Sequence, residues 1–294
     1  METSKLVLAN PQLRLVGLVD KDPRKIGRDM GFGARVGGSV EDCVRRTNPD
    51  IAFLMTASRF SEVIKDIRIL TRMGVDVVSS CEELVFPWVA DPSMAKKLNG
   101  FIRKRKRRVL GTGVNPGFVM DLLPLTLASV CQNIESIRVL RIVDVSKRRL
   151  PLQKKMAVGL SKTEFIRRLR QEKIGHAGLK ESIALIASGI GLKLQIRETI
   201  RPIAVRNQVI GIAQTATGTL AGRKKMILEL SMSWGAKDPR DEVHVVGTPP
   251  VHMKIRPGIQ GDMATAACLV HAALKLDKAP YGLLTVKGLP AGIN

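Results

Sequence analysis

Aromatic side chains are scarce in this chain of 294 residues, since Phe, Trp and Tyr together make up only 3% of it. Proteins that hold single-stranded nucleic acid stack its bases on such rings, so that kind of surface is poorly supplied here. The chain also lacks any run close to the ~20 consecutive apolar residues that a membrane-spanning helix needs. Its first residues, METSKLVLANPQ, show neither the basic stretch nor the long apolar core of a signal peptide. These absences favour a globular protein with no membrane segment.

Cysteines are few and far apart, and no two of them form a CxxC pair. We expect them to be reduced thiols in a cytoplasmic protein: Cys43, Cys81, Cys131 and Cys268. The histidines show no metal-ligand spacing, and no GxSxG nucleophile motif is present. Three of them fall in expected strands or a helix and are interpreted as structural: His244, His252 and His271. The sequence therefore predicts no metal site.

Acidic residues are also in short supply, with 26 Asp and Glu against 48 Lys and Arg, which gives a net charge of +22. Such a balance is found in nucleic-acid-binding proteins, and a non-catalytic or nucleic-acid-binding basic protein is one alternative. The distribution argues against it, because the densest cluster, FIRKRKRRVLG at 101–111, stands between two apolar segments and the other cations are scattered. We expect a solvated basic surface that attracts anionic ligands such as dinucleotide phosphates.

Glycine is missing where a dinucleotide-binding domain would have it. LRLVGLVDKDP, residues 13–23, has the pattern of the second strand of such a domain: an apolar run that ends in an acid before a turn. A first strand and a glycine-rich loop should precede it, but the twelve residues before Leu13 contain no Gly. GFGARVGG at 31–38 is no substitute, because it follows the strand and opens no helix. We therefore expect a chain that starts too late and binds NAD(P)H poorly, without the amides that receive a pyrophosphate.

Apolar runs and helical patterns alternate through the first 110 residues. Strand-length apolar runs lie at 51–56 and 75–80, and helical spacing follows at 60–73 and from residue 91. Ser39 is placed to cap a helix over 40–46. This alternation predicts an open parallel α/β sheet, in which ligands lie at the carboxyl ends of the strands. Small, polar or glycine residues stand at those ends: Asp20, Thr56, Ser58, Ser80 and the glycines of GTG at 111–113.

The second half has a different character. Residues 134–143 are rich in β-branched side chains, Ser161 to Glu164 match a capping box, and several strands are expected between 193 and 256. Helices are expected at 179–190 and 262–276. The predicted fold class is α/β: a Rossmann-type parallel sheet whose first strand is missing, with a second α+β domain. The first domain would comprise 1–118 plus 257–294, and 119–256 would form a substrate and oligomerisation domain.

Several polar residues are candidates for chemistry. Asp20 is placed to accept hydrogen bonds from an adenosine ribose, although a plain turn aspartate would also suit DKDP. Lys21, Arg24 and Lys25 follow it and suit a 2′-phosphate, so the choice between NAD and NADP stays open. GTGVNPGFVMDLLP at 111–124 must form a tight irregular turn, suited to a nicotinamide ring or a substrate, or else to an interdomain linker.

Cations and a histidine provide the substrate-side candidates. The segment 141–160 is expected to end a strand at Asp144 and then to form a loop whose cations can clamp a carboxylate or donate a proton: Lys147, Arg148, Arg149, Lys154 and Lys155. His176 lies between glycines ahead of a helix and is the best histidine candidate. Glu181 is placed to orient it or to bind a substrate amine.

Five segments together carry a resemblance to a known family: CEELVFPW, GTGVNPGFVMDLLPLTL, IVDVSKRRLPLQKKMAVGL, IGHAGLKES and PGIQGDMATAACLVHAA. They resemble the 2,4-diaminopentanoate dehydrogenases, within the wider dihydrodipicolinate reductase-like group, from about residue 13 to 290. The resemblance implies an NAD(P)-binding Rossmann domain, an α+β substrate domain and a homo-oligomer. It also implies hydride transfer at a carbon that bears nitrogen, in the oxidative deamination of a diamino acid or the reverse imine reduction.

The resemblance also implies roles for residues. Asp20 would meet the ribose, and four residues would line the dinucleotide and the nicotinamide: Thr56, Ser58, Ser80 and Asn115. Lys154, His176 and Glu181 would act on the substrate side. The dihydrodipicolinate reductases proper have a paired-histidine motif and a later Lys followed by SGT, whereas this chain reads DVSKRRLPLQKK. This departure favours the amine-dehydrogenase branch over the alternative, reduction of a cyclic imine dicarboxylate in lysine biosynthesis.

Overall fold

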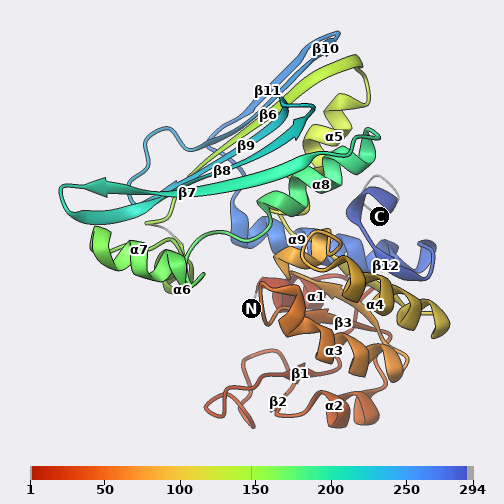
Figure 1. Ribbon diagram of the computed structural model, residues 1–294. Coiled ribbons are helices and arrows are strands. Elements are labelled where there is room, and N and C mark those ends of the chain that lie inside the picture. The colour runs from red at the N-terminus through yellow and green to blue at the C-terminus, as the bar shows by residue number, and fades with distance from the viewer. Residues whose placement is uncertain (1, 147, 290–294) are drawn as a thin grey trace. The chain divides into compact units, whose positions relative to one another are not determined.

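The computed structural model describes residues 2–146 and 148–289 (Figure 1). The chain divides into two compact units: unit 1 comprises Met1–Gly117 with Gly261–Asn294, and unit 2 comprises Phe118–Gln260. The two boundaries between the units lie one residue before and four residues after those that the sequence suggests. No helix among the described residues combines the length and the apolar character that crossing a bilayer requires.

Unit 1 is built on a parallel four-stranded sheet in the order β12-β5-β4-β3. Its strands are β3 (Ile51–Leu54), β4 (Asp76–Ser79), β5 (Arg108–Gly111) and β12 (Gly282–Leu284). The two continuous apolar runs become β3 and β4, as expected for strands that are covered on both faces. Each strand is two residues shorter than its apolar run, because the ends of the runs lie outside the ladder that pairs β3 with β4.

The helices of unit 1 follow the predicted positions closely. They are α1 (Glu2–Ala9), α2 (Val40–Thr47), α3 (Phe60–Arg72), α4 (Pro92–Lys104) and α9 (Gly261–Lys275), with short 3-10 turns at Glu82–Val85, Leu276–Lys278 and Val286–Gly288. The Ser39 hydroxyl accepts the Asp42 amide at 3.2 Å and so caps α2, as expected. The Asp91 carboxylate caps α4 in the same way through the Met94 amide, at 2.8 Å.

The predicted strand at 13–19 is mostly wrong. Only β1 (Leu18–Val19) forms, paired in parallel with β2 (Val36–Gly37) in a separate two-stranded sheet. Within the described residues, no strand pairs with residues 13–17, and the Leu13 amide donates instead to the Asn10 carbonyl at 3.1 Å. The segment KDPRKIG, residues 21–27, forms turns. Gly31 and Gly33 lie at positive φ in an open loop that starts no helix, as expected.

The core of unit 1 lies between the sheet and its helices. Val63 and Ile67 of α3 are fully buried, and they belong to one cluster with Val77 of β4, Leu98 of α4 and Val109 of β5. The i, i+4 spacing on α3 places its apolar side chains on one face. Each fully buried side chain of this size contributes roughly 1.5–3 kcal/mol of hydrophobic stabilisation. This packing fixes the carboxyl ends of β3, β4 and β5 beside one another.

Unit 2 contains a mixed six-stranded sheet in the order β11-β10-β6-β9-β8-β7. Its strands are β6 (Gln132–Asp144), β7 (Gln195–Val205), β8 (Gln208–Leu220), β9 (Arg223–Ser233), β10 (Arg240–Thr248) and β11 (Val251–Ile255). The pair β6–β9 is parallel and the other four pairs are antiparallel. The run of neighbouring strands in the sequence therefore predicted the second domain correctly.

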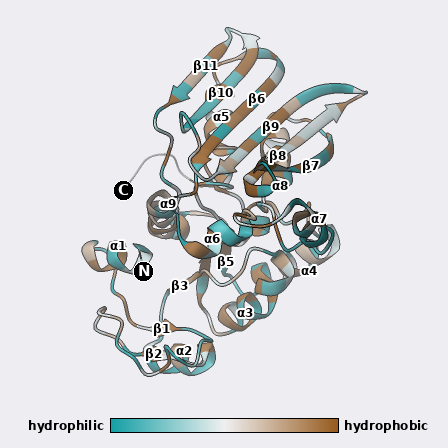
Figure 2. Cartoon of the chain, turned by 90° about the vertical axis from the view of Figure 1, so that its left-hand side faces the viewer, coloured by the Kyte–Doolittle hydropathy of each residue, from teal (hydrophilic) through white to brown (hydrophobic). Residues whose placement is uncertain are grey.

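Helices cover one side of this sheet. α5 (Leu122–Ala128) contacts β6 and β10, α8 (Leu179–Gly189) contacts β7 to β9, and the two helices touch each other (Figure 1). α7 (Lys162–Arg170) begins at Ser161, whose hydroxyl accepts the Glu164 amide at 3.2 Å. The Glu164 carboxylate forms ion pairs with Arg167 and Arg168. The basic C-terminal half of α7 makes this helix largely hydrophilic (Figure 2).

β6 ends at Asp144, as expected, but the loop that was expected after it contains a short helix. α6 (Leu150–Lys155) begins with Leu150 and Pro151, and a proline suits a first helical turn because no intrahelical partner awaits its missing N–H there. A buried ion pair anchors the strand before it: Arg141 Nη1 lies 2.8 Å from Asp241 Oδ1. The same two side chains bind the backbone N–H and C=O of Ile259. Breaking such a buried pair typically costs about 3–5 kcal/mol.

Candidate functional site

The carboxyl ends of β3 and β4 are tied together by hydrogen bonds. The Ser79 hydroxyl and the Ser80 amide both donate to the carbonyl of Leu54, at 2.7 and 3.2 Å. The carbonyl of Ser58 accepts the Cys81 thiol at 3.2 Å. Thr56 is exposed here, and Ser58 and Ser80 are half-buried. The structure therefore brings three of the predicted cofactor residues to the same edge of the sheet.

The GTGVNPG turn, residues 111–117, follows β5 at that edge and admits only glycine at two positions. A Cβ on Gly111 would stand 2.4 Å from the Leu84 carbonyl carbon. Gly117 has φ +122°, and a Cβ there would stand 2.4 Å from the Gly113 nitrogen. Thr265 of α9 closes the turn by accepting the Val114 amide at 3.3 Å. The glycines thus permit a close backbone approach that side chains would block.

Asn115 lies within this turn and carries an unsatisfied acceptor. Its Oδ1 atom is buried and has no hydrogen-bond partner among the described residues. Leaving a buried acceptor unsatisfied costs about 1–3 kcal/mol, so such atoms are uncommon and call for an explanation. The carboxamide of a nicotinamide ring is an N–H donor that would satisfy it. The residues present therefore fit a nicotinamide cofactor at this edge.

Asp20 follows β1 and closes the turn after this strand, as the DKDP sequence suggests. Its Oδ1 accepts the Asp22 amide at 2.9 Å, which is an Asx turn, and its Oδ2 lies 2.5 Å from Lys25 Nζ. The hydrogen bond from Lys25 and, after it, that from the Asp22 amide lower the pKa of Asp20 below its ordinary value. The carboxylate is therefore ionised at neutral pH and able to accept a ribose hydroxyl.

The cations after Asp20 are already paired with acids. Lys21 Nζ lies 3.4 Å from Asp66 Oδ2, Arg24 Nη2 lies 2.9 Å from Asp22 Oδ2, and Lys25 pairs with Asp20. All three cations are exposed, so these pairs are weak and open to competition. A 2′-phosphate would have to displace carboxylates here, which leaves NAD and NADP both chemically feasible.

In unit 2, His176 is held through its backbone. Gln214 of β8 accepts the His176 amide at 2.8 Å and donates to the His176 carbonyl at 2.6 Å. The ring Nδ1 lies 2.6 Å from the carbonyl oxygen of Ala177. Because a carbonyl can only accept, Nδ1 carries a proton in this contact.

The other two substrate-side residues lie in different surroundings. Lys154 is exposed on α6, and the contact with the histidine loop is made by Lys155, whose carbonyl accepts the Gly175 amide at 3.1 Å. Glu181 is only 2% exposed, in the first turn of α8. Its neighbour Ser182 donates to Asp121 at 2.8 Å. Lys147, one of the predicted loop cations, lies outside the described residues.

Gln214 is a residue that the sequence interpretation missed. It is 1% exposed and donates to Glu198 Oε1 at 2.7 Å, in addition to clamping His176. Burial raises the pKa of Glu198, while Gln214 and then Lys180 act to lower it. A signal existed in the strand QVIGIAQTATGTL: Gln214 takes the inward position between Ile212 and Ala216, where an apolar residue is expected.

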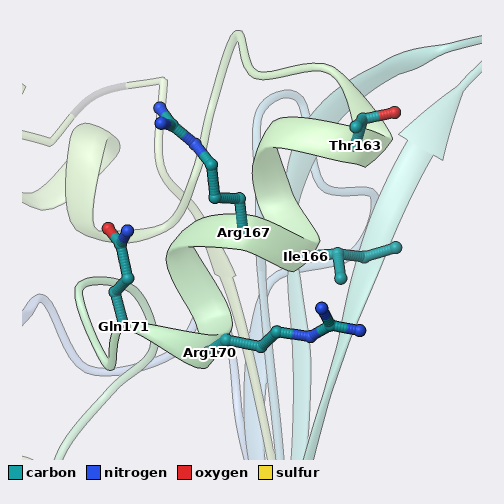
Figure 3. A pocket seen from close by; sticks show the side chains of 5 residues that line it. All are labelled: Thr163, Ile166, Arg167, Arg170 and Gln171. Carbon is teal, nitrogen blue, oxygen red and sulfur yellow. The ribbon is translucent and has the colours of Figure 1, made fainter.

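Two shallow surface hollows are recorded in unit 2. One, of about 400 Å³, runs along α7, where side chains spread in different directions and do not converge (Figure 3): Thr163, Ile166, Arg167, Arg170 and Gln171. The other, of about 640 Å³, lies between the start of α7 and the β7–β8 turn. Neither hollow contains a predicted site residue.

Comparison with known proteins identifies the family. The model of the 2,4-diaminopentanoate dehydrogenase C-terminal domain matches residues 118–293, more than half of the chain. The chain belongs to this family. The expected resemblance is therefore confirmed, and so is the oxidoreductase class. Within the family, a 2,4-diaminopentanoate dehydrogenase from Acetoanaerobium sticklandii is 28% identical over 272 residues, which cover 86% of this chain and 77% of that one.

Solved structures confirm the Rossmann-type fold of this family member. An amine dehydrogenase from Mycobacterium smegmatis superposes with a TM-score of 0.86 at 20% identity, covering 99% of this chain and 93% of the other. The WlbA dehydrogenase from Bordetella pertussis, solved with NADH and UDP-GlcNAcA, gives a TM-score of 0.53 at 12% identity, covering 86% and 75%. At such identities the likeness concerns the fold alone, and the roles of individual residues stay predictions.

Proposed function

We propose that the protein is an NAD(P)-dependent dehydrogenase that acts on a carbon bearing an amino group in a small diamino acid such as 2,4-diaminopentanoate. Family membership supports the reaction class, and the relative from Acetoanaerobium sticklandii supports the substrate class. The observation that carries the proposal is the buried acceptor of Asn115, beside the strand ends of a Rossmann-type sheet. In the reverse direction the same site reduces an imine.

Unit 1 supplies the cofactor side in this proposal. Asp20 accepts a ribose hydroxyl, and the hydroxyls of Thr56, Ser58 and Ser80 line the dinucleotide. Asn115 would hold the carboxamide of the nicotinamide through its Oδ1 atom and would thereby orient the ring. A bound nicotinamide supplies hydride transfer, which no side chain of the protein can perform.

Unit 2 supplies the substrate side. The substrate carbon gives up a hydride and its nitrogen gives up a proton, so the amine becomes an imine, which water converts to a carbonyl and ammonia. His176 takes the proton, and its Nδ1 contact with the Ala177 carbonyl orients the ring. Glu181 binds or orients the amine, and Lys154 binds the substrate carboxylate.

The direct test is a cofactor-linked assay of the purified chain with diamino acids, 2,4-diaminopentanoate first, using NAD and NADP separately. We expect reduction of the cofactor with at least one diamino acid. Turnover of dihydrodipicolinate with NADPH and of no diamino acid would favour the lysine-biosynthesis alternative instead. A titration of NADH and NADPH on the same sample measures whether binding is weaker than low micromolar, as the sequence leads us to expect.

The Asn115→Ala variant tests the residue that carries the proposal. Removing one partner of a hydrogen bond costs about 1.5 kcal/mol, so we expect the cofactor dissociation constant to rise about tenfold. Asn133→Ala is the matched control, because Asn133 is exposed on β6 and should leave binding unchanged. Equal dissociation constants for Asn115→Ala and the unaltered chain would refute the role of this side chain.

A homo-oligomer in the cytoplasm is the finer form of the proposal. The side of the six-stranded sheet away from α5 and α8 offers a broad surface for a second copy, with Val246 of β10 46% exposed on it. The free thiols of Cys43, Cys81 and Cys131 suit a reducing compartment. Light scattering of the purified chain and fractionation of its native cells test the two statements separately.

A further inference from the structure

Two histidines that form no sequence motif face each other across two neighbouring strands. In the antiparallel pair β10–β11, His244 stands directly opposite His252, and Glu242 stands opposite Lys254. Side chains alternate along β10, so Asp241, Val243 and Val245 are buried while Glu242 and His244 lie on the other side. The two imidazole rings are stacked, with centroids 3.9 Å apart and planes inclined by 18°.

Glu242 completes a group of three metal-binding side chains. Its Oε2 lies 3.4 Å from His244 Nε2, and one ligand atom from each of the three residues lies within 4.8 Å of the others. A tetrahedral zinc ion with bonds of about 2.0–2.2 Å holds its ligand atoms roughly 3.4 Å apart. Glu242 and His244 already have this separation. His252 is exposed, so its ring needs only a side-chain rotation to bring a nitrogen to the same point.

The carboxylate is oriented with one oxygen toward the histidines. Its other oxygen, Oε1, accepts Arg240 Nε at 2.7 Å and lies 3.0 Å from Lys254 Nζ. Arg240 is itself held by Asp238 at 3.1 Å. In metal sites, ligating carboxylates are hydrogen-bonded in this way by outer partners. The two cations oppose a bound dication electrostatically, but they lie on the oxygen that faces away from it.

Arg138 of β6 is a further charge beside this group, since it stands opposite His244 in the sheet. Its Nε atom lies 2.6 Å from Glu229 Oε2, and this ion pair compensates the positive charge of Arg138. Two neutral imidazoles and a carboxylate are the ligand types that zinc and similar borderline metals select, whereas Mg²⁺ and Ca²⁺ prefer oxygen ligands.

We propose that Glu242, His244 and His252 bind a divalent transition-metal ion of the zinc type on the exposed side of β10 and β11. Three protein ligands leave a fourth position for water or an external ligand. The ion would cross-link the edge strand β11 to β10. No step of the proposed dehydrogenation uses these residues, so the metal site can be tested independently of the proposed function.

The test titrates Zn²⁺ alone into the purified, chelator-treated full chain, kept reduced, by isothermal titration calorimetry. We expect one equivalent to bind with about micromolar affinity. His244→Ala and His252→Ala should each weaken binding about tenfold or more. His271→Ala on α9 is the matched control and should bind as the unaltered chain does. Zn²⁺ should also raise the melting temperature of the unaltered chain and of His271→Ala, but not of His252→Ala.

Two readouts keep the proposal open to refutation. Unchanged zinc affinity in both His244→Ala and His252→Ala would overturn it. Co²⁺ gives a charge-transfer band when thiolates bind it, and such a band would assign the metal to cysteines instead. If His252→Ala does not fold, as judged by circular dichroism, His252→Gln serves in its place, with the same loss of affinity expected and unchanged affinity counting against the site.

Discussion

Asp20 illustrates how one side chain serves two purposes. Its Oδ1 closes the turn after β1, and its Oδ2 faces Lys25 at 2.5 Å, at an exposed position. The pairing keeps the carboxylate ionised. An anion at this point accepts a ribose 2′-hydroxyl but repels a 2′-phosphate, whereas Lys25 has the opposite preference. The balance of these two side chains is therefore expected to set the cofactor preference.

The Asp20→Asn variant is expected to favour NADP. Removing the negative charge leaves Lys25 without its anion, so the ratio of kcat/KM for NADP to that for NAD should rise about tenfold, equivalent to about 1.4 kcal/mol. Steady-state kinetics with both cofactors measure the ratio. Asp29→Asn is the control, because Asp29 is an exposed acid whose carboxylate only accepts the Gly31 amide. A ratio that does not move in Asp20→Asn would exclude a ribose role for this residue.

The turn 111–117 is the element on which the proposed cofactor site depends most. It follows β5 directly, passes the Leu84 backbone so closely that Gly111 has no room for a Cβ, and then folds back on itself at Gly117. Asn115 owes its burial to this course of the chain. A change that opens the turn should therefore reduce stability and cofactor binding together.

Gly117→Ala is expected to lower the free energy of unfolding by more than about 3 kcal/mol, because strain at positive φ adds to a steric overlap. Gly31→Ala is the matched control: it also lies at positive φ, +80°, but a Cβ there meets nothing within 4 Å, so only about 1 kcal/mol of strain is expected. Urea denaturation gives both values. Similar losses in the two variants would show that the close approach to Gly113 is not what makes the turn intolerant.

The charge of the whole molecule makes it sensitive to acid. Three acids have pKa values lowered to about 2: Asp22 through Arg24, Glu164 through Arg167 and Arg168, and Glu242 through Arg240 and Lys254. Since these folded values lie below the unfolded values near 4, their contribution to stability is complete above about pH 5 and is lost as the pH falls toward 2. Protonating the acids also leaves the positive charge of 48 Lys and Arg uncompensated.

The urea midpoint is therefore expected to fall between pH 5 and pH 3, and added salt should restore part of the loss by screening the repulsion. Measurements are made with chelator present. Glu242→Gln should depend less steeply on pH than the unaltered chain, whereas Glu41→Gln, which changes an acid in the first turn of α2, should show the full dependence. A midpoint that stays constant down to pH 3 would contradict the electrostatic account.

Local patterns were enough to predict most of the elements. The apolar runs at 51–56 and 75–80 became strands, Ser39 and Ser161 capped helices as expected, and the run of strands after 193 became a sheet. These features depend on neighbours in the sequence, whose periodicity and hydrogen bonding are readable there. The predictions were wrong where contacts with distant parts of the chain decide the local structure. Residues 13–17 have no strand to pair with, and α6 formed where only a loop with cations was expected.

The composition and motifs fixed the α/β fold, the family and the classes of residue at the site, because burial and backbone conformation follow residue type closely. The folded chain alone decided which side chains meet. His244 and His252 stand opposite each other only because β10 and β11 pair in one register, and a shift by one residue would turn one of them to the other side. Likewise, Gln214 reaches His176 from a strand 38 residues away. Such contacts depend on long-range pairing, which cannot be predicted from the local sequence around either partner.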